Sequence, residues 1–350
     1  MAAFQCNRLH ETDPPLNIQD VARRAGVSVA TVSRAFNLPD RVAPATRERV
    51  ERIARDLGYL PNVSARALRT QRSRVLGIVL PTLLNPAFAE CLQGIAETAA
   101  AGGYAILPVT TGYALDREAH AVAQLIASNV DGMILVVSSA SDAVALRRLH
   151  DAGVPYVLAY NRHSAHPCVS VDGETAAAEV VARLAGLGHR RIAMVSGTLA
   201  ASDRAQQRFA GFRRGMAEAG LATPPLVEVP FVERAAETLR ELLQAPSRPT
   251  ALFCSNDLLA IRCLRAAHGS GLRVPHDLTV VGFDGIALGE ELTPALSTVV
   301  QPNRDIGRHG VELLLRALAT GEAPTAASSL TLPHAFREGE SCGVARSGVP

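Results

Sequence analysis

The chain has 350 residues, of which 48% are hydrophobic, and a formal net charge of +2 at pH 7. This length can bury a sizeable core, but no apolar run approaches the roughly 20 residues of a membrane-spanning helix, so we expect no membrane partner. The six cysteines are scattered without a C-x-x-C pair, which favours reduced thiols in a cytoplasm and predicts neither a metal site nor a cofactor.

The charge is divided unevenly along the chain. Residues 17–74 hold twelve arginines and five acidic residues, a net charge of about +7, whereas residues 75–350 hold 22 arginines and 26 acidic residues, about −4. A basic first part ahead of a mildly acidic body is expected if only the first part binds a polyanion. Residues 1–16 contain charges and two adjacent prolines but no continuous apolar stretch, so we predict a disordered extension and no secretory signal.

Residues 17–37 predict two short helices joined by a tight turn. Asn17 can cap the first helix, and Gly26 can end it with a positive φ. Ser28 can cap a second helix over residues 29–36, with Val32, Ala35 and Phe36 facing the first helix. The outward-facing side chains of the second helix are Val29, Ala30, Thr31, Ser33 and Arg34. This pattern matches the helix-turn-helix motif that places its second helix in the DNA major groove, although any small helical hairpin shares it.

A third helix is predicted over residues 44–57, because Pro44 is tolerated in a first turn and Gly58 can end the helix. We therefore predict an all-α helix-turn-helix domain over residues 17–60, with a hinge helix and linker over residues 61–74. The part of the hinge from Asn62 to Leu68 spans only two turns, which is too short to be helical alone in water, and a plain linker is the alternative.

Four sequence blocks of this region occur in a characteristic order and spacing. They are DVARRAGVSVATVSRAFN, TRERV, LGYLPN and ARAL. They resemble the lac repressor (LacI/GalR) family of bacterial transcription regulators, and a looser similarity continues to about Leu332. The resemblance implies a hinge helix that folds on DNA, pairs with its twin and inserts Leu68 into the minor groove.

The outward face of the second helix and the hinge supply the predicted DNA contacts. Arg34 is the best candidate for a bidentate contact to guanine, with a phosphate contact as the alternative. Val29 and Ala30 can offer only apolar contact, for example to a thymine methyl group, whereas the polar side chains can hold phosphates. The full predicted set is Ser28, Val29, Ala30, Thr31, Ser33, Arg34, Asn37, Asn62, Ala65 and Leu68.

From residue 75 to 337, short apolar runs alternate with helical segments. This pattern predicts two α/β lobes with parallel sheets covered by helices. The predicted strands are 75–80, 104–108, 132–137, 155–159, 192–196, 251–254 and 278–283. The predicted helices are 86–101, 116–128, 142–152, 173–187, 205–219, 233–244, 258–268 and 303–318. The resemblance implies the fold of periplasmic sugar-binding proteins, two lobes around a cleft.

Ligands of such folds bind beyond the carboxyl ends of the strands. The residues that we predict to contact a small effector are Phe88, Asn161, Arg208, Asn256 and Asp284. Arginine donors, a carboxylate and an amide suit the hydroxyl groups of a sugar or sugar derivative. Asp172 and Asp257 follow strands too, but we expect them to cap helices. Thr82 and Ala87 stand where the family usually has an acid and an aromatic, so the effector cannot be named.

The sequence therefore predicts a dimeric transcription regulator, first of all a repressor of a carbohydrate or other small-metabolite operon, with an effector between the lobes and a palindromic operator on double-stranded DNA. A homodimer is expected over a tetramer, because the flexible tail predicted for residues 338–350 carries no heptad leucines of the kind that form a tetramer in the lac repressor. A sugar-binding protein without a DNA role, a nucleobase-responsive regulator and an activator stay open. An enzyme is not expected, since catalytic motifs are missing and His163 and His166 suit a solvated loop.

Overall fold

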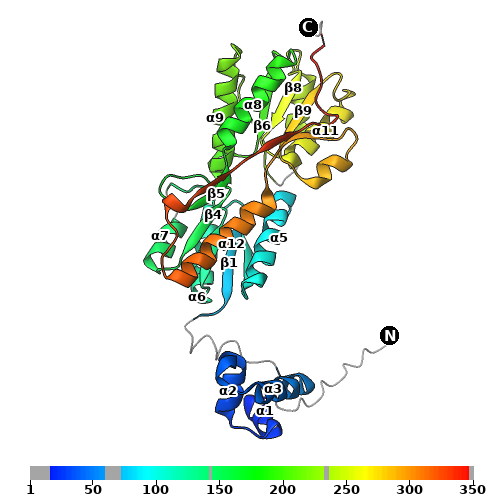
Figure 1. Ribbon diagram of the computed structural model, residues 1–350. Helices are drawn as coiled ribbons and strands as arrows, with labels where there is room; N and C mark the ends of the chain where they lie inside the picture. Colours follow the sequence, from blue (N-terminus) through cyan, green and yellow to red (C-terminus); the bar gives the residue numbers. More distant parts are fainter. Residues whose placement is uncertain (1–15, 60–71, 142–143, 232–235, 347–350) are drawn as a thin grey trace, which may run out of the picture. The chain divides into compact units, whose positions relative to one another are not determined.

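The computed structural model describes residues 16–59, 72–141, 144–231 and 236–346 (Figure 1). The chain divides into two compact units, of which the first ends at Ser73 and the second begins at Arg74. The first unit is helical and the second is α/β, as predicted. The hinge residues 60–71 and most of the N-terminal extension lie outside the described residues, so the hinge helix stays a prediction.

The first unit holds α1 (Ile18–Ala25), α2 (Val29–Asn37) and α3 (Pro44–Leu57), with a 3₁₀ turn over Pro39–Arg41. Asn17 and Asp20 form a reciprocal capping box at the start of α1. Gly26 has a φ of 63°, and its amide closes the helix by binding the carbonyl groups of Ala22 and Arg23. The predicted helix-turn-helix is confirmed: Asn17 and Gly26 set the two ends of α1, and Ser28 caps the start of α2.

A small core holds these three helices together. It consists of buried, mostly small side chains from all three: Val21, Ala22, Ala25, Val32, Ala35, Val50 and Ala54. Phe36 and Tyr59 pack against it, with ring centroids 6.2 Å apart. A core this small gives marginal stability, as expected for a unit of about fifty residues.

The second unit contains two six-stranded sheets, one in each lobe. The first sheet has the order β11-β5-β4-β3-β1-β2 and is parallel throughout. Its strands are β1 (Val75–Leu80), β2 (Ala105–Thr110), β3 (Gly132–Leu135), β4 (Tyr156–Ala159), β5 (Cys168–Val171) and β11 (Leu330–Leu332). One face packs on α5 (Pro86–Ala101) and α12 (Asn303–Thr320), and the other on α6 (Leu115–Ala127) and α7 (Val144–Asp151).

The second sheet has the order β12-β10-β9-β8-β6-β7, with only β10 and β12 antiparallel among its described pairs. Its strands are β6 (Ile192–Ser196), β7 (Val227–Glu228), β8 (Ala251–Cys254), β9 (Thr279–Asp284), β10 (Ser297–Val300) and β12 (Ala335–Arg337). One face packs on α8 (Gly173–Gly186) and α9 (Asp203–Glu218), and the other on α10 (Ala236–Gln244) and α11 (Asp257–Gly269).

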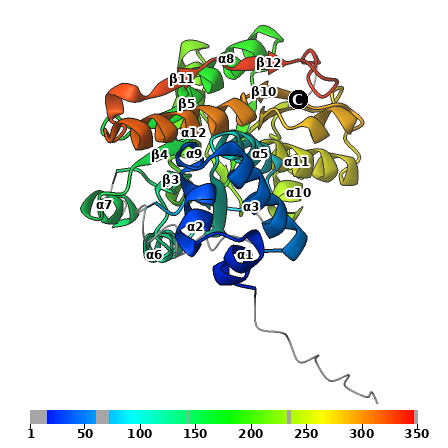
Figure 2. The same ribbon diagram turned by 60° about the horizontal axis from the view of Figure 1, so that its bottom comes forward.

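The chain crosses between the lobes at three places, after β5, after β10 and after β11. The second crossing returns the chain to the first lobe as α12, which lies beside α5 in both views (Figures 1 and 2). In each sheet the strand order reverses at a central strand, β1 in the first lobe and β6 in the second. These reversals create the crevices in which ligands of open α/β sheets bind.

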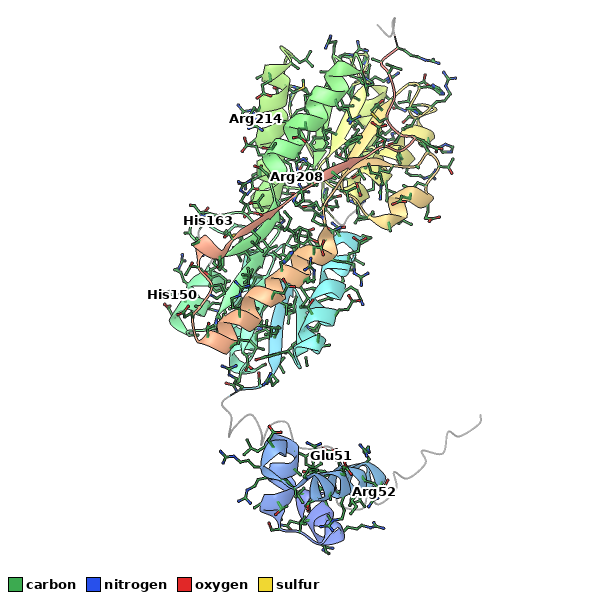
Figure 3. All side chains as sticks on the ribbon, viewed as in Figure 1. Glu51, Arg52, His150, His163, Arg208 and Arg214 are labelled. Atoms are coloured by element: carbon green, nitrogen blue, oxygen red, sulfur yellow. The ribbon has the colours of Figure 1, made fainter. Side chains whose placement is uncertain are left out.

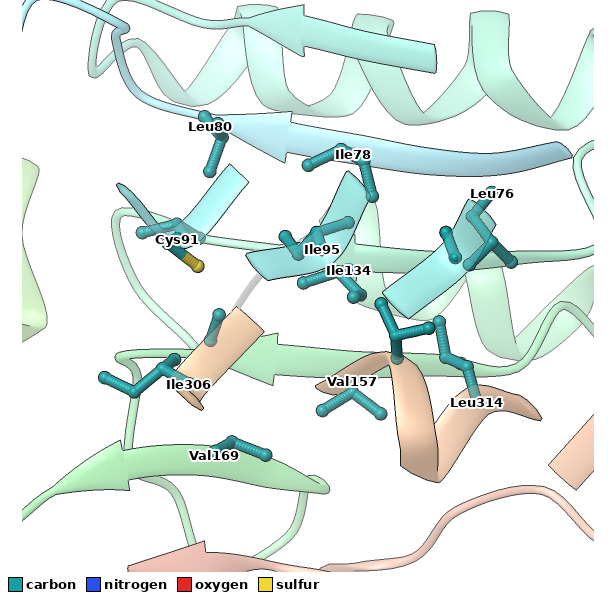
Figure 4. Close-up of a cluster of buried hydrophobic side chains, with 14 of the residues drawn as sticks. Leu76, Ile78, Leu80, Cys91, Ile95, Ile134, Val157, Val169, Ile306 and Leu314 are labelled. Atoms are coloured by element: carbon teal, nitrogen blue, oxygen red, sulfur yellow. The ribbon is translucent and has the colours of Figure 1, made fainter. Parts of the chain in front are cut away.

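Close packing of α5 on α12 helps form the core of the first lobe. Side chains of β1, α5 and α12 meet in one buried layer, shown by Ile78, Ile95 and Leu314 (Figure 4). Two glycines allow the helices to approach closely. A Cβ on Gly94 of α5 would lie 2.1 Å from the carbonyl oxygen of Arg304, and one on Gly307 of α12 would lie 2.2 Å from that of Cys91.

The structure corrects the sequence predictions at several boundaries. The short edge strands β7, β11 and β12 were not predicted, because two or three residues show no recognisable alternation. Residues 338–346 do not form a flexible tail, since Ser341 is fully buried and its hydroxyl group donates to the carbonyl oxygen of Val280 at 2.6 Å. The Ser341 side chain also accepts a hydrogen bond from the backbone amide of Ser297. These hydrogen bonds hold the segment against the sheet of the second lobe.

We predict that Gly94→Ala destabilises the protein by ~1–3 kcal/mol, because the new methyl group overlaps the α12 backbone and forces the helices apart. The control is Gly186→Ala at the end of α8, where a Cβ would meet nothing within 4 Å and alanine favours the helix. Urea unfolding midpoints check this prediction. Equal effects of the two substitutions would show that close approach of α5 to α12 does not require a glycine at position 94.

Candidate functional site

The exposed face of α2 is the first candidate site. Ala30, Arg34 and Val29 are exposed, the last to 41%, whereas Val32 and Ala35 are buried. Thr31 and Ser33 are half-buried. The observed face is therefore the one predicted to point outward, although its contact with DNA stays a prediction.

Ser28 and Thr31 have a structural role within this face. The Ser28 side chain accepts a hydrogen bond from the Thr31 amide at 3.1 Å, and their hydroxyl oxygens lie 2.9 Å apart. That hydroxyl pair uses one of its two protons, so the other can donate to a phosphate. Asn37 belongs to α2, but its side chain is outside the described residues, as are Asn62, Ala65 and Leu68.

The first unit keeps a basic surface despite two ion pairs along its helices. Arg23 and Asp20 lie 3.1 Å apart, and Arg47 and Glu51 lie 3.7 Å apart. Both pairs are largely exposed and contribute little stability. Figure 3 labels Glu51 and Arg52 on α3. An exposed, arginine-rich surface of this kind attracts a polyanion without fixing its sequence.

A cavity lies between the two lobes of the second unit, at the carboxyl ends of the strands. Its lining comes from both lobes: Asn85, Phe88, Tyr113, Tyr160, Ser202, Arg204, Ala205, Arg208, Phe231, Ser255, Asn256 and Asp284. The space open to the centre of a water molecule is about 20 Å³. The lobes are therefore closed on each other, and a ligand larger than water must part groups of the wall.

Arg208 and Asp284 form a buried ion pair in the wall of this cavity. The guanidinium Nη2 lies 3.6 Å from the Asp284 Oδ1, and Nη1 donates to the backbone carbonyl group of Ser255. The guanidinium carbon also lies 3.7 Å from the centre of the Phe283 ring. Figure 3 labels Arg208 on α9. This packing fixes the arginine in one orientation.

The Asp284 carboxylate joins the lobes. It accepts a hydrogen bond from Asn85 of the first lobe at 3.1 Å and one from Gln301, at the second crossing, at 2.8 Å. The Asn303 side chain donates to the Asp284 carbonyl oxygen at 3.1 Å. Burial raises the pKa of Asp284, and the Arg208 charge opposes this rise. Any group that competes for Asp284 therefore acts on both a lobe and a hinge.

The backbone at Asp284 is strained. Its φ is 119°, followed by Gly285 at 73°, whereas a non-glycine residue with positive φ costs of order 1–3 kcal/mol. A Cβ at Gly285 would lie 2.6 Å from the Cα of Val300, so any other residue at position 285 would clash with β10. Strained positions of this kind cluster at ligand sites, and Asp284 lines the cavity.

Four of the five predicted effector contacts, Phe88, Arg208, Asn256 and Asp284, line this one cavity. Asn161 is not among its lining residues. The Asn161 amide is fully buried and bonds both backbone groups of Val137 and, at 2.8 Å, the Asp203 carboxylate. It therefore serves as a link between the lobes. Binding by the other four residues stays a prediction.

Of the two helix caps predicted from the sequence, one is confirmed and one is wrong. Asp172 caps α8 by accepting from the Thr175 amide at 3.1 Å. The cap of α11 is Asn256, which accepts from the Leu259 amide at 2.8 Å, and not Asp257. Asp257 is buried and accepts hydrogen bonds from the Thr298 hydroxyl and the Ile286 amide.

Several cavity residues were not selected from the sequence. Tyr113 follows β2 and Phe231 follows β7, and their rings stack across the lobes with centroids 4.5 Å apart and an interplanar angle of 10°. Burial raises the pKa of Tyr113 to about 12. Each aromatic follows a short apolar run and stands directly after a glycine or a proline. This position could have marked both residues in the sequence as candidates for a loop at a strand end. Asn85 and Arg204 could have been chosen by the same reasoning, since each directly precedes a helix predicted from the sequence.

A second space of about 210 Å³ adjoins this stack. It shares Asn85, Tyr113, Phe231 and Asn256 with the cavity, and adds Thr82, Leu84, Leu258 and Arg262. The stacked rings therefore line both the narrow cavity and the larger second space. A ligand that enters from that side must separate or displace them.

The remaining predictions concern metal and membrane. Within the described ranges, no three His, Cys, Asp or Glu residues are grouped to hold a metal ion. The His163 and His166 rings lie 4.9 Å apart, and His166 pairs with the Tyr156 hydroxyl at 2.8 Å. No helix in the described part of the chain has the length and apolar character to cross a membrane.

Comparison with protein families matches both units. Residues 17–62 match the bacterial regulatory proteins of the lacI family, and residues 181–342 match the periplasmic binding protein-like domain. The chain is 34% identical to catabolite control protein A of Priestia megaterium over 91% of this chain and 97% of that protein. It is also 34% identical to the HTH-type transcriptional repressor CytR of Escherichia coli K12, over 85% and 88%.

Solved structures show the same architecture. The lac repressor dimer bound to operator and the anti-inducer ONPF has a TM-score of 0.83 at 27% identity, covering 95% of this chain and all of that chain. A complex of the transcriptional regulator CelR with cellobiose has a TM-score of 0.68 at 29% identity, covering 93% and 99%.

We predict that Asp257→Asn changes the pH dependence of stability. Burial, with a contribution from the Asp284 charge, raises the pKa of Asp257 from 3.8 to about 7. The folded state therefore binds more protons than the unfolded state between these values, and the free energy of unfolding falls as pH rises through this window. Asparagine carries no charge; its oxygen can accept from the Ile286 amide while its NH2 group donates to the Thr298 hydroxyl oxygen, which must reverse its role. The melting temperature of the variant relative to wild type should therefore rise from pH 4 to pH 8.

Calorimetric melting at four pH values between 4 and 8 measures this difference. Asp305→Asn, on the exposed face of α12, is the matched control. A difference between Asp257→Asn and wild type that does not vary with pH would contradict a carboxyl group protonated by burial.

Proposed function

The chain belongs to the lacI family of bacterial regulatory proteins, DNA-binding transcriptional repressors regulated by effectors, and we propose that it controls a carbohydrate or other small-metabolite operon. The effector binds in the cavity between the lobes. The observation that carries this proposal is the closed cavity built around Arg208 and Asp284, whose carboxylate also bonds the other lobe and the second crossing. Such chemistry suits a small polar ligand.

A homodimer reads the operator. Two copies of α2 lie in successive major grooves of a palindromic site, about one helical turn apart. Support comes from the lac repressor structure, which is a dimer bound to operator and resembles 95% of this chain. Arg34, exposed on α2, reads a guanine, and the leucine of the hinge, Leu68, enters the minor groove between the half-sites.

The effector acts on DNA binding through the hinge of the second unit. Asp284 bonds Gln301 and Asn303, which stand between β10 and α12 where the chain crosses between the lobes. A ligand that takes one of the Asp284 hydrogen bonds shifts the balance between open and closed lobes. Coupling of this kind between two sites is typically ~1–3 kcal/mol and is reciprocal.

The effector is a sugar or sugar derivative, as the CelR–cellobiose complex supports for a similar fold. A nucleobase is the second candidate, favoured by the stacked rings of Tyr113 and Phe231. A flat base can insert between two parallel rings, gaining stacking on both faces. A thermal-shift screen of sugars, sugar acids and nucleobases on the full-length protein separates the two classes, because a bound ligand raises the melting temperature by mass action.

We predict that Arg34→Ala relaxes sequence preference at one base pair of each half-site. The loss of a bidentate guanine contact should cost ~1–3 kcal/mol at that position. Selection of operators from a randomised duplex pool, followed by titration in a fluorescence anisotropy assay, measures this cost. Arg213→Ala, an exposed arginine on α9 of the second unit, serves as the control. If the base preference of Arg34→Ala equals that of wild type, Arg34 contacts a phosphate or no DNA.

We predict that Asp284→Asn abolishes the effect of the effector on operator affinity while affinity without effector stays within about tenfold. The amide keeps the size of the carboxylate, but its single oxygen cannot accept hydrogen bonds from both Asn85 and Gln301. It also lacks the negative charge that pairs with Arg208. The same anisotropy assay with and without the effector found by the screen tests this. A normal dose–response in Asp284→Asn, like that expected for the exposed control Asp305→Asn, would place the effector elsewhere.

A further inference from the structure

Arg204 is a second arginine in the cavity, one helical turn before Arg208 on α9. Only 6% of it is exposed. Its Nη1 donates to the carbonyl oxygen of Val137, in the other lobe, at 2.6 Å and lies 3.3 Å from an oxygen of Asp203. These contacts hold the guanidinium plane in place.

The second terminal nitrogen of the Arg204 guanidinium, Nη2, makes no hydrogen bond to the described part of the chain. This nitrogen is also buried. A buried charged donor without an acceptor is costly, and native structures rarely keep one without a functional reason. Because Nη1 already fixes the plane, Nη2 is preorganised to donate two hydrogens to something absent from the chain itself.

A second open group lies in the same wall. The hydroxyl group of Ser255 is buried and, within the described part of the chain, also lacks a hydrogen-bond partner. The acceptor oxygens of Asp284 and Asn256, by contrast, already receive hydrogen bonds. Both Asp284 oxygens accept hydrogen bonds, and the Asn256 oxygen accepts from the Leu259 amide. Among the described residues of the wall, the unused groups are therefore Nη2 of Arg204, which can only donate, and the Ser255 hydroxyl, which can donate or accept.

The charges of the residues that line the cavity also favour an anionic ligand. Its charged residues are two arginines, Arg204 and Arg208, and one acid, Asp284. Asp203 lies beside Arg204 but outside the lining, and its carboxylate also accepts from the Asn161 amide at 2.8 Å. A neutral polyol offers a donor with every acceptor, whereas a carboxylate or phosphate offers acceptors alone and matches an open guanidinium edge.

We propose that Arg204 binds an anionic group of the effector, a carboxylate or a phosphate, and so selects an acidic sugar derivative or similar small oxyanion over its neutral counterpart. This inference rests on the proposed function, since it takes the inter-lobe cavity as the effector site. Arg208 and Asp284 bind the neutral part of the ligand, and Arg204 sets its charge.

The test uses the full-length protein and compounds matched in pairs by charge. The pairs are gluconate with glucose, glucuronate with methyl glucoside, ribose 5-phosphate with ribose, and adenosine monophosphate with adenosine. Thermal shift and titration calorimetry report binding. We expect at least one acidic member to raise the melting temperature while its neutral partner does not. The carboxylate and phosphate pairs distinguish the two sources of charge.

Variants then assign the preference to Arg204. Arg204→Gln should weaken binding of the acidic compound about tenfold or more, the loss expected for a charge-assisted hydrogen bond, and Arg204→Lys should retain part of the affinity. Arg213→Gln, exposed on the same helix, should change nothing. If Arg204→Gln does not fold, Arg204→Met replaces it, with the same loss of affinity for the acidic compound expected.

Binding of neutral members alone, no binding by any acidic member, or equal binding of the acid by wild type and Arg204→Gln would overturn the inference. The proposed function is judged separately, by operator affinity. A neutral compound that binds and changes operator affinity leaves the proposed function intact while removing the role of Arg204. If none of the compounds that bind changes operator affinity, the proposed function itself is contradicted.

Discussion

The organisation of the second unit depends on one buried carboxylate. Asp284 lies in a strained backbone, beside the Arg208 charge, and bonds Asn85 of the opposite lobe and Gln301 of the second crossing. A buried charge is tolerated only when it is paired and hydrogen-bonded. The lobes must therefore stay close enough for Asn85 to reach it, or a ligand must replace what Asn85 supplies. In this way the requirement to satisfy one carboxylate links ligand, lobe closure and hinge.

Other contacts across the same seam reinforce this arrangement. Asn161 bonds the Asp203 carboxylate, Arg204 bonds the Val137 carbonyl group, and Tyr113 stacks on Phe231. All connect a loop at the carboxyl ends of one sheet to a loop or helix start of the other. Because the two arginines stand one turn apart on α9, any movement of this helix changes both at once. The first unit needs no such device, since its helices are fixed by local caps and a small core.

Much of this could be predicted from the sequence, and the parts that could not share a physical cause. Asn17, Gly26 and Ser28 act on their own turns, so both ends of α1 and the start of α2 follow from nearby residues. Phe88, Arg208, Asn256 and Asp284 could be proposed for the cavity because each stands at or near a strand end or a helix start. Asn161 satisfies that rule equally well, yet its amide is consumed by groups 24 and 42 residues away. Only the folded chain reveals such partners, and the same holds for the open edge of Arg204 and the positive φ of Asp284.

The most direct test of lobe closure is hydrogen exchange at the backbone amide of Asp203 in the full-length protein. Asp203 is the first residue of α9, and its amide donates to the Ser138 carbonyl oxygen of the other lobe at 2.8 Å, so its protection reports closure and not helix formation. The account predicts slow exchange in the wild-type protein and fast exchange in Asn85→Ala, while the amide of Ile134 in β3 stays protected in both. Fast exchange of Asp203 in the wild-type protein, or equal protection in the two proteins, would contradict a closed state held by Asp284.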